Sequence, residues 1–367
     1  MRFSSFADPF RIYTLKEVLQ RISFPVTVDE NKLYYQIGIR SHSKGIFYKE
    51  AEIGKQIGNK RIFWIEPNCL ILNIVFAWEQ AVAKTSEKEV GMVASHRFPM
   101  YKVLNNSLDY IVDFFKTEKG KQLLQMASPG GAGRNKTLNQ DFFLNSKIYL
   151  PSLNEQLKTT ELIELIEDRI ETQIKIINDY KLLKRYITKS FIKQKGTSYL
   201  LSEIAELGRG RVISSAEISK QKNPIYPVYS SQTSNNGVMG YLDNYDYEGE
   251  YITWTTDGAN AGTVYYRNGK FNCTNVCGIL KIKNGYDAYY ISNILNCYTK
   301  KYVSTNLANP KLMNNVMANI KINLPSIERQ KYFSNILKAI EYRIKIEQDI
   351  KLNLVKQKVF LLKNMFL

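Results

Sequence analysis

The side chains that most often carry catalysis or bind metal ions are few in this sequence and widely spaced. It contains two histidines, His42 and His96, and four cysteines. A tetrahedral zinc site needs His or Cys ligands at short spacings, and Cys273-x3-Cys277 has no histidine in its half of the chain. Neither histidine has a convincing nucleophile partner for a catalytic triad. The sequence therefore predicts no catalytic residue and no metal ligand, with dispersed carboxylates left as an open alternative.

Two stretches match nucleotide or methyl-transfer motifs only in part. Asn223-Pro224-Ile225-Tyr226 differs by one residue from the Asn-Pro-Pro-Tyr motif of adenine methyltransferases, but no Gly-rich cofactor fingerprint precedes it. Residues 130–136 have the composition of a phosphate loop without its spacing. We interpret the first stretch as a polar turn and the second as a flexible loop, in which Arg134 and Lys136 are candidates for contacts with DNA phosphate.

Loops that combine basic, amide and hydroxyl side chains with aromatic ones are the remaining candidates for function. Such side chains hydrogen-bond to base edges in the major groove of DNA and bind its phosphates. In the first half of the chain the candidates for DNA binding are Arg40, His42, Lys44, Trp78, Gln80 and Arg97, together with Arg134 and Lys136. In the second half they are Ser231, Gln232, Asn235, Asn236, Thr255, Thr256, Asp257, Asn260, Arg267 and Lys311. For each residue taken singly, a solvated loop side chain is the alternative.

The composition agrees with a polyanionic partner. The formal net charge is +17, which favours nucleic acid first and an acidic membrane second. No apolar run approaches the roughly 18 residues of a membrane span, and the first residues do not resemble a signal peptide. The four cysteines form no disulfide framework. We therefore expect a cytoplasmic protein with no membrane partner.

Short strands and helices must position these loops. Alternating or continuous apolar patterns predict strands at 32–40, 61–65, 69–76 and 147–150, and later at 227–229, 238–242, 251–255, 263–266 and 278–282. Helices are expected at 108–125, 138–143 and 289–296, and turns at 235–237, 257–260 and 268–269. The mixture predicts two globular domains of the α/β (α+β) class.

A long helix separates the two sets of loops. From Pro151 to Lys193 no further Pro or Gly interrupts the chain, which allows a helix of about 40 residues, roughly 60 Å long. Ser152 and Glu155 have the spacing of a capping box at its start. Apolar residues recur at alternating spacings of three and four, which predicts a coiled-coil seam through Ile163, Ile166, Ile170, Ile177 and Ile187, interrupted at Gln173 and Lys184.

The partner of this helix is a repeat of it. Residues 319–326 repeat residues 145–152 at an offset of 174, so that Pro151 corresponds to Pro325 and Gln156 to Gln330. Arg329 stands where the first copy has Glu155. The second seam runs through Leu337, Ile340, Ile344, Leu354 and Leu361. We expect the two helices to pack as an antiparallel coiled coil related by a pseudo-twofold axis.

This arrangement resembles the specificity subunit of type I restriction–modification systems, the HsdS family. The resemblance covers essentially the whole chain. It is carried by the helix entries Leu-Pro-Ser-Leu-Asn-Glu-Gln (150–156) and Leu-Pro-Ser-Ile-Glu-Arg-Gln (324–330), by the helix ends at 187–192 and 361–366, and by segments such as 226–229 and 240–243. The divisions expected from it are target-recognition domains at 1–150 and 196–324, a central helix at 151–195 and a C-terminal helix at 325–367.

The resemblance implies a DNA-reading scaffold that is not itself an enzyme. Each target-recognition domain would read one part of a split, asymmetric DNA site. The chain would recruit two modification subunits, which bind S-adenosylmethionine, and two restriction subunits, which use ATP and Mg²⁺, and would bind no cofactor itself. The alternatives are a basic coiled-coil scaffold that reads no sequence, and the specificity subunit of a methylation-only or type IIB-like system. A catalytic methyltransferase would have to bind S-adenosylmethionine by itself.

Overall fold

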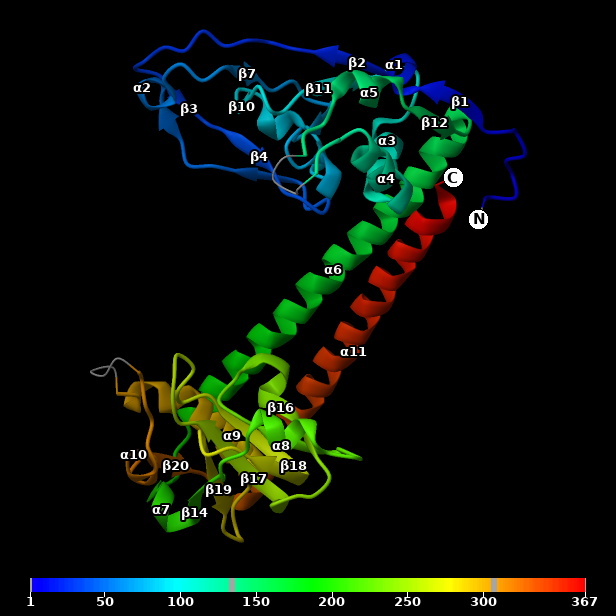
Figure 1. The fold of residues 1–367 in the computed structure, drawn as a ribbon. Helices are drawn as coiled ribbons and strands as arrows, with labels where there is room; N and C mark the ends of the chain where they lie inside the picture. The colour runs from blue at the N-terminus through cyan, green and yellow to red at the C-terminus, as the bar shows by residue number, and fades with distance from the viewer. Residues whose placement is uncertain (1, 132–135, 305–308, 367) are drawn as a thin grey trace. The chain divides into compact units, whose positions relative to one another are not determined.

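The computed structural model describes residues 2–131, 136–304 and 309–366, and it divides into two compact units. The first unit comprises Met1–Ile174 with Ile350–Leu367, and the second comprises Lys175–Asp349. Two long helices, α6 (Leu153–Ile192) and α11 (Ile327–Met365), each contribute one segment to each unit (Figure 1). Both helices agree with the sequence prediction to within about two residues at their starts and at the end of α11.

The two helices run antiparallel within each unit. In the second unit the end of α6 meets the start of α11, where the rings of Phe191 and Phe333 stack with centroids 3.6 Å apart. In the first unit the end of α11 meets the domain core beside the start of α6, and Phe366 packs on Tyr110 with centroids 4.6 Å apart. Ile163 is buried in the same unit.

Burial along the helices follows the predicted seams. On α6, Ile163 and Ile177 are buried and Ile166, Ile170 and Ile187 are half-buried. On α11 the buried seam residues are Leu337, Ile340 and Leu354, and the half-buried ones are Ile344 and Leu361. The packed antiparallel helices and the mixed α/β units confirm the predicted fold class.

The first unit is built on several small antiparallel sheets. The largest has the strand order β2-β11-β8-β9, and smaller ladders pair β1 with β12, β7 with β10, β3 with β6 and β4 with β5. The strands are β1 (Arg11–Thr14), β2 (Leu19–Ile22), β3 (Leu33–Tyr34), β4 (Ile37–Ile39), β5 (Ile46–Tyr48), β6 (Glu52–Ile53), β7 (Ile62–Trp64), β8 (Leu70–Leu72), β9 (Val82–Lys84), β10 (Val93–Ser95), β11 (Met100–Val103) and β12 (Lys147–Leu150).

Short helices cover the core of the first unit. They are α1 (Leu15–Val18), α2 (Gly54–Ile57), α3 (Leu108–Lys116), α4 (Glu118–Met126) and α5 (Gln140–Asn145), with 3-10 turns η1 (Ala77–Glu79) and η2 (Glu87–Glu89). Leu15, Tyr101, Phe115 and Phe143 are fully buried there, and Met365 from the end of α11 joins them. The end of α11 is therefore part of this core.

The second unit contains one six-stranded sheet with the order β14-β19-β17-β18-β15-β16, and a separate ladder of β13 with β20. Its strands are β13 (Thr197–Leu200), β14 (Ala205–Arg209), β15 (Tyr226–Tyr229), β16 (Val238–Leu242), β17 (Tyr247–Thr255), β18 (Val264–Cys273), β19 (Cys277–Ile282) and β20 (Lys321–Leu324). Its helical elements are α7 (Leu201–Ile204), α8 (Ser215–Ser219), η4 (Ser234–Gly237), α9 (Ala288–Tyr298), η5 (Thr299–Tyr302) and α10 (Asn314–Ala318).

One structural frame occurs in both units. In the first, β1 pairs with β12, which leads into α6; in the second, β13 pairs with β20, which leads into α11 (Figure 1). A one-turn helix follows the entering strand in each case, and a glutamate caps it: Glu17 binds the amide of Thr14, and Glu203 binds the amide of Leu200. The repeat read from the sequence is therefore also a repeat of contacts.

Buried glutamines fasten the start of each long helix to its unit. The Gln156 amide donates to the Pro151 carbonyl and accepts from the Ser107 amide, both at 3.0 Å. Gln330 repeats this, donating to the Pro325 carbonyl at 2.8 Å and accepting from the Asp287 amide at 3.0 Å. Ser107 and Asp287 are the N-caps of α3 and α9, so each glutamine joins two helix starts.

Four local predictions need correction. The helix expected at 108–125 is two helices, because Thr117 ends α3 and caps α4 with its side chain. Residues 32–40 form two short strands rather than one. Asn268-Gly269 lies inside β18 opposite Gly249, not in a turn. Glu155 forms a two-bonded ion pair with Arg2, at 2.7 and 2.6 Å, instead of closing a capping box with Ser152.

Candidate nucleic-acid interface

The first-unit loop that carries Arg40, His42 and Lys44 is held against the segment that carries Trp78. The loop joins β4 to β5, and His42 adopts a left-handed backbone with φ of 59°. The His42 amide donates to the Glu79 carbonyl at 2.6 Å, and the Ser41 hydroxyl donates to the Glu79 carboxylate at 2.8 Å. Two of the predicted sites are thus one surface, with Arg40, His42 and Lys44 exposed.

Trp78 and Lys136 meet on the same surface, whereas Gln80 has a different role. The Lys136 ammonium lies 5.0 Å from the centre of the Trp78 ring. The Gln80 amide points inward and donates to the carbonyls of Phe115 and Thr117 at 3.0 and 3.1 Å, at the end of α3. Gln80 therefore supports the fold of this region. Arg134 lies outside the described residues.

Arg97 belongs to a second place on the first unit. It is exposed in the turn between β10 and β11, next to His96. Its carbonyl accepts from the amide of Ile74 at 3.0 Å, which ties the turn to the chain that leads toward Trp78. The structure thus puts Arg97 close in the fold to that segment.

In the second unit, the loop between β15 and β16 presents a pair of asparagines. Asn235 and Asn236 are exposed, and both have left-handed backbone conformations, with φ of 48° and 51°. Asparagine tolerates this conformation better than most residues. The Gln232 side chain bonds to the Val238 carbonyl across the loop, and Ser231 is half-buried. The backbone conformation thus turns the loop sharply, and both asparagines stay accessible.

Arg267 is buried under this loop instead of being exposed. Only 7% of the residue is accessible, and its guanidinium lies 3.5 Å from the Tyr229 ring centre and 4.4 Å from that of Tyr265. It donates to the Thr253 hydroxyl at 3.2 Å and to the Asn236 carbonyl at 2.8 Å. Burial lowers the pKa of this guanidinium. Arg267 is placed to hold the asparagine loop from beneath.

Two of the remaining second-unit candidates, Thr256 and Lys311, contact Asp257. Its carboxylate accepts from the Thr256 hydroxyl at 2.5 Å and lies 3.5 Å from the Arg209 guanidinium and 3.8 Å from the Lys311 ammonium. Thr255 and Thr256 are buried, so their side chains do not reach the surface. Asn260 is exposed in the following turn. Sequence reasoning missed Arg209, since nothing local to it indicates an acidic partner far along the chain.

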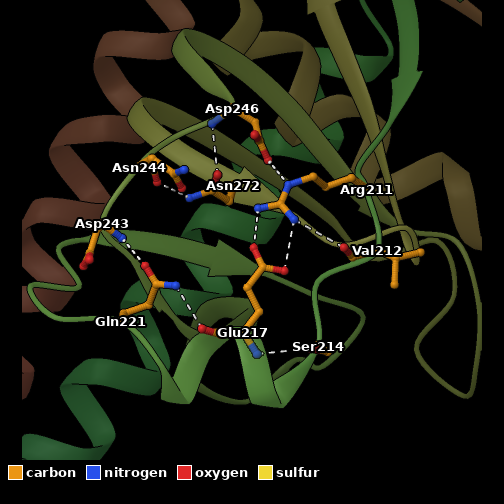
Figure 2. Close-up of polar contacts among 9 residues, drawn as sticks. All are labelled: Arg211, Val212, Ser214, Glu217, Gln221, Asp243, Asn244, Asp246 and Asn272. Atoms are coloured by element: carbon orange, nitrogen blue, oxygen red, sulfur yellow. Dashed lines mark hydrogen bonds and ion pairs between the residues drawn. The ribbon is translucent and has the colours of Figure 1, made fainter.

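Arg211, which the sequence did not indicate either, joins α8 to the segment that precedes β17. Arg211 pairs with Glu217 at 2.7 Å and with Asp246 at 3.1 Å, as Figure 2 shows. Asn272 of β18 continues the network by accepting from the Asp246 amide at 2.9 Å and donating to the Asn244 carbonyl at 2.8 Å (Figure 2). The network fixes the chain on both sides of β15 and β16, which flank the asparagine loop.

The methyltransferase-like stretch is a turn. The amide of Asn223 donates to the Asp243 carboxylate at 2.8 Å, and the Asp243 amide donates to Gln221 at 3.0 Å. Across the part of the chain that the structure describes, no group of three or more His, Cys, Asp or Glu side chains could hold a metal ion. Nor does any described helix combine the length and apolarity needed to cross a membrane.

Comparisons with known proteins agree on one family. Residues 196–357 match a family model described as the type I restriction modification DNA specificity domain. A Mycoplasma pneumoniae protein, S.MpnORF201P, described as a type I specificity subunit, is 37% identical over 199 residues, 53% of this chain and 82% of that protein. The type I restriction enzyme MpnII specificity subunit of the same organism is 42% identical over 146 residues, 39% of this chain and 43% of that protein.

Solved structures share the fold at low sequence identity. The crystal structure of the S subunit of a type I restriction–modification system from M. genitalium aligns with a TM-score of 0.62 and 13% identity, covering 100% of this chain and 98% of that one. A chain from a study of type I complex assembly and conformational transition aligns with a TM-score of 0.65 and 14% identity, covering 98% and 97%. These likenesses concern the arrangement of elements.

Proposed function

Because this chain belongs to the family of type I restriction–modification specificity subunits, we propose that it reads a DNA site made of two separated parts, one through each unit. The observation that carries the proposal is the repeated frame. Each copy of the frame encloses a different sheet with a different set of exposed polar loops. A repeated frame with different loops suits a protein that reads two unlike sequences.

The reading surface of the first unit is formed by Arg40, His42 and Lys44 with Trp78 and Lys136. These groups combine charge for phosphate with an aromatic face and hydrogen-bond donors. Arg97 extends the surface, and Arg134 stays a candidate from the sequence. The exposure of Arg40, His42, Lys44 and Arg97 supports this, as does the absence of acidic partners for Arg40 and Lys44 among the described residues.

The reading surface of the second unit is formed by Asn235 and Asn236, together with Asn260 and Lys311 from later loops of the same unit. Asparagine side chains can bind adenine through two hydrogen bonds, and lysine binds phosphate. Arg267, Gln232, Thr255 and Thr256 act from below as supports. Asp257 orients Arg209 and Lys311, whose side chains it contacts.

The divisions of the chain follow from this role. Residues 1–150 and 196–324 are the target-recognition domains, and residues 151–195 and 325–367 are the helices that set the distance between them. The polar seam positions and the exposed apolar side chains on the helices support a further role in assembly. Examples are Tyr186, Tyr332, Tyr342 and Phe360, all largely exposed in the chain alone.

The helices recruit two modification subunits and two restriction subunits, and the chain itself carries no catalytic step. S-adenosylmethionine belongs to the modification subunits, and ATP with Mg²⁺ to the restriction subunits. The chain contributes recognition and geometry: its loops choose the site, and its helices hold the recruited subunits at fixed places along the DNA.

Methylation mapping tests the proposal. Host DNA is sequenced for N6-methyladenine with this chain present or deleted and with its modification subunit expressed in both. We expect one bipartite motif to disappear on deletion. Exchanging residues 196–324 for those of another specificity subunit should change one part of the motif and leave the other part and the spacing intact. A motif that persists without the chain contradicts the proposal, and so does one that the exchange leaves unchanged.

A further inference from the structure

A small basic hollow lies in the first unit beside the proposed reading surface. It has a volume of about 220 Å³, and its lining includes Arg21, Arg61, Ile74, His96 and Gln140. Two arginines and a histidine thus surround it, and no carboxylate does. We call it the basic hollow.

Strand register brings its polar side chains together from distant parts of the chain. Arg21 on β2 is opposite Tyr101 on β11, and Ile62, next to Arg61, is opposite Ser95, next to His96. The His96 amide also donates to the Arg61 carbonyl at 3.2 Å. The hollow is therefore a product of the sheets and not of one flexible loop.

Gln140 completes the lining as a neutral donor. The Tyr101 hydroxyl donates to its side-chain oxygen at 3.1 Å, which turns the amide nitrogen away from that contact. Tyr101 is itself buried, and burial raises its pKa to about 12, so its hydroxyl stays protonated and remains the donor. No described residue accepts from the amide nitrogen of Gln140.

Arg21 and Arg61 are exposed and have no acidic partner among the described residues, as is also true of Arg40, whereas several other arginines of the protein are paired. Arg2 is paired with Glu155, and Arg211 is paired with Glu217 and Asp246. Within the described ranges, by contrast, the side chains of Arg21 and Arg61 form no hydrogen bond or ion pair. Unpaired cations converging on a concave surface create a positive potential that attracts an anion.

The volume of the hollow and its position beside Arg97 indicate which anion it could bind. Pockets for small molecules usually measure about 300–1,000 Å³, so this one suits a single compact group. The planar guanidinium of arginine binds two oxygens of a phosphate with two parallel hydrogen bonds. Arg97 follows His96 directly, and Ile74 in the lining is bonded to Arg97, so the hollow continues the surface proposed for DNA.

We propose that the basic hollow seats one phosphate of the DNA backbone, held by Arg21 and Arg61 with Gln140 and His96 beside them. The inference rests on the proposed function and adds residues that position the duplex without reading its bases. A backbone contact fixes the register of a reading surface on DNA and is indifferent to sequence. The exposed groups around Arg40 and Trp78 would then meet the same bases in each encounter.

Salt dependence of DNA binding tests the proposal. The chain assembled with its modification subunits is titrated with duplexes that contain the mapped site or a scrambled one, over a range of salt concentrations. The Arg21→Gln/Arg61→Gln variant should reduce the slope of log K against log salt by about 1 on both duplexes and weaken binding about tenfold or more. The methylated motif should stay the same.

The control variant is Arg11→Gln/Lys147→Gln. It removes the same charge from the same unit, at exposed positions of the β1–β12 ladder that do not line the hollow. Its slope of log K against log salt should change by less than half as much as that of the Arg21→Gln/Arg61→Gln variant. An equal change in both variants, or no change in the hollow variant, overturns the inference. In either case intact site preference in the wild type leaves the proposed function standing, whereas no preference in the wild type contradicts that function.

A free anion is the other source of the same chemistry. Inorganic phosphate is titrated into the wild-type complex by calorimetry, with and without bound duplex. Weak binding of inorganic phosphate that is lost when the duplex is bound supports a site for a phosphate of the DNA backbone. Binding of equal strength in both conditions means that the duplex does not fill the hollow, and this overturns the inference.

Discussion

Lys184 and Glu341 form an ion pair between α6 and α11 in the second unit, and the residues 174 positions from each, Lys358 and Glu167, form the same pair in the first unit. The lysine lies at a seam position in both cases, where it interrupts the apolar series. A shift of one helix along the other would break both pairs at once. The polar interruptions therefore specify one antiparallel register, a known use of polar seam residues.

Charge reversal at Lys184 should weaken this register. Lys184→Glu faces Glu341 with a like charge, and because the pair is partly exposed we expect a loss of roughly 1 kcal/mol in the free energy of unfolding. Adding Glu341→Lys should restore most of it. Lys181→Glu, at an exposed position one turn earlier, is the control. Chemical denaturation of the wild type, Lys184→Glu, Glu341→Lys and the double variant gives the coupling, and strictly additive effects would contradict a specific pair.

Removing the Gln330 amide should loosen the second unit at the start of α11. Gln330→Ala leaves the Asp287 amide and the Pro325 carbonyl without this partner in a site that is 2% exposed. We expect a loss of roughly 2 kcal/mol or more, with faster hydrogen exchange in α9. Gln348→Ala on the exposed face of the same helix should cost far less. Equal stability of the two variants would rule out the fastening role.

Substitution of Arg267 should damage recognition by the second unit alone. Arg267→Met removes the donor to the Asn236 carbonyl, so the asparagine loop loses its support. If the proposed function holds, methylation mapping should show at least a tenfold loss of discrimination in one part of the motif and none in the other. Arg267→Lys should retain part of it. Lys220→Met, an exposed cation of the same unit, is the control. Equal loss in both parts of the motif would instead indicate failed assembly.

Acid should destabilise the first unit through Glu89. Burial raises the pKa of this carboxyl, but hydrogen bonds from Tyr48 and Ser86, at 2.5 and 2.7 Å, outweigh it and leave the pKa below its ordinary value. The pKa is thus lower when folded than when unfolded. The stabilisation is complete above the unfolded value, about 4.3, and is lost as the pH falls through the folded one.

Glu89→Gln should remove that dependence. At pH 7 we expect it to cost about 1–3 kcal/mol, because charge-assisted hydrogen bonds are lost. Between pH 6 and pH 3 its stability should fall less than that of the wild type. Glu87→Gln, an exposed neighbour, should follow the wild-type profile. Denaturation at a series of pH values measures this, and parallel profiles for Glu89→Gln and the wild type would contradict it.

The long helices could be predicted because their burial follows a local rule. Each seam residue faces the partner helix at spacings of three and four, so the pattern is visible in the sequence even where Gln173 interrupts it. The break at Thr117 was missed although its signals are local. A capping threonine precedes Gly120, where a side chain would meet the Phe114 carbonyl at 2.2 Å. The apolar pattern continues across the break and concealed it.

The site could be predicted only in outline, because burial and pairing depend on residues far along the chain. Arg267 is a residue of the type that contacts DNA at a surface, but Tyr229 on a neighbouring strand and Tyr265 cover its guanidinium. Gln80 points inward because the end of α3 offers it two carbonyls. No local pattern marks Arg21 and Arg61 in the sequence, because their convergence depends on the register of two separate ladders.

The ladders β1–β12 and β13–β20 have a consequence for how such a protein can change. In each unit the first strand pairs with the last one, so that the segment between them begins and ends at the same two-stranded ladder. The segment between the paired strands therefore does not alter where the long helices begin. It forms a four-stranded sheet in one copy and a six-stranded sheet in the other. Such segments can therefore evolve by exchange as whole units, while the long helices stay under separate selection for their length and register.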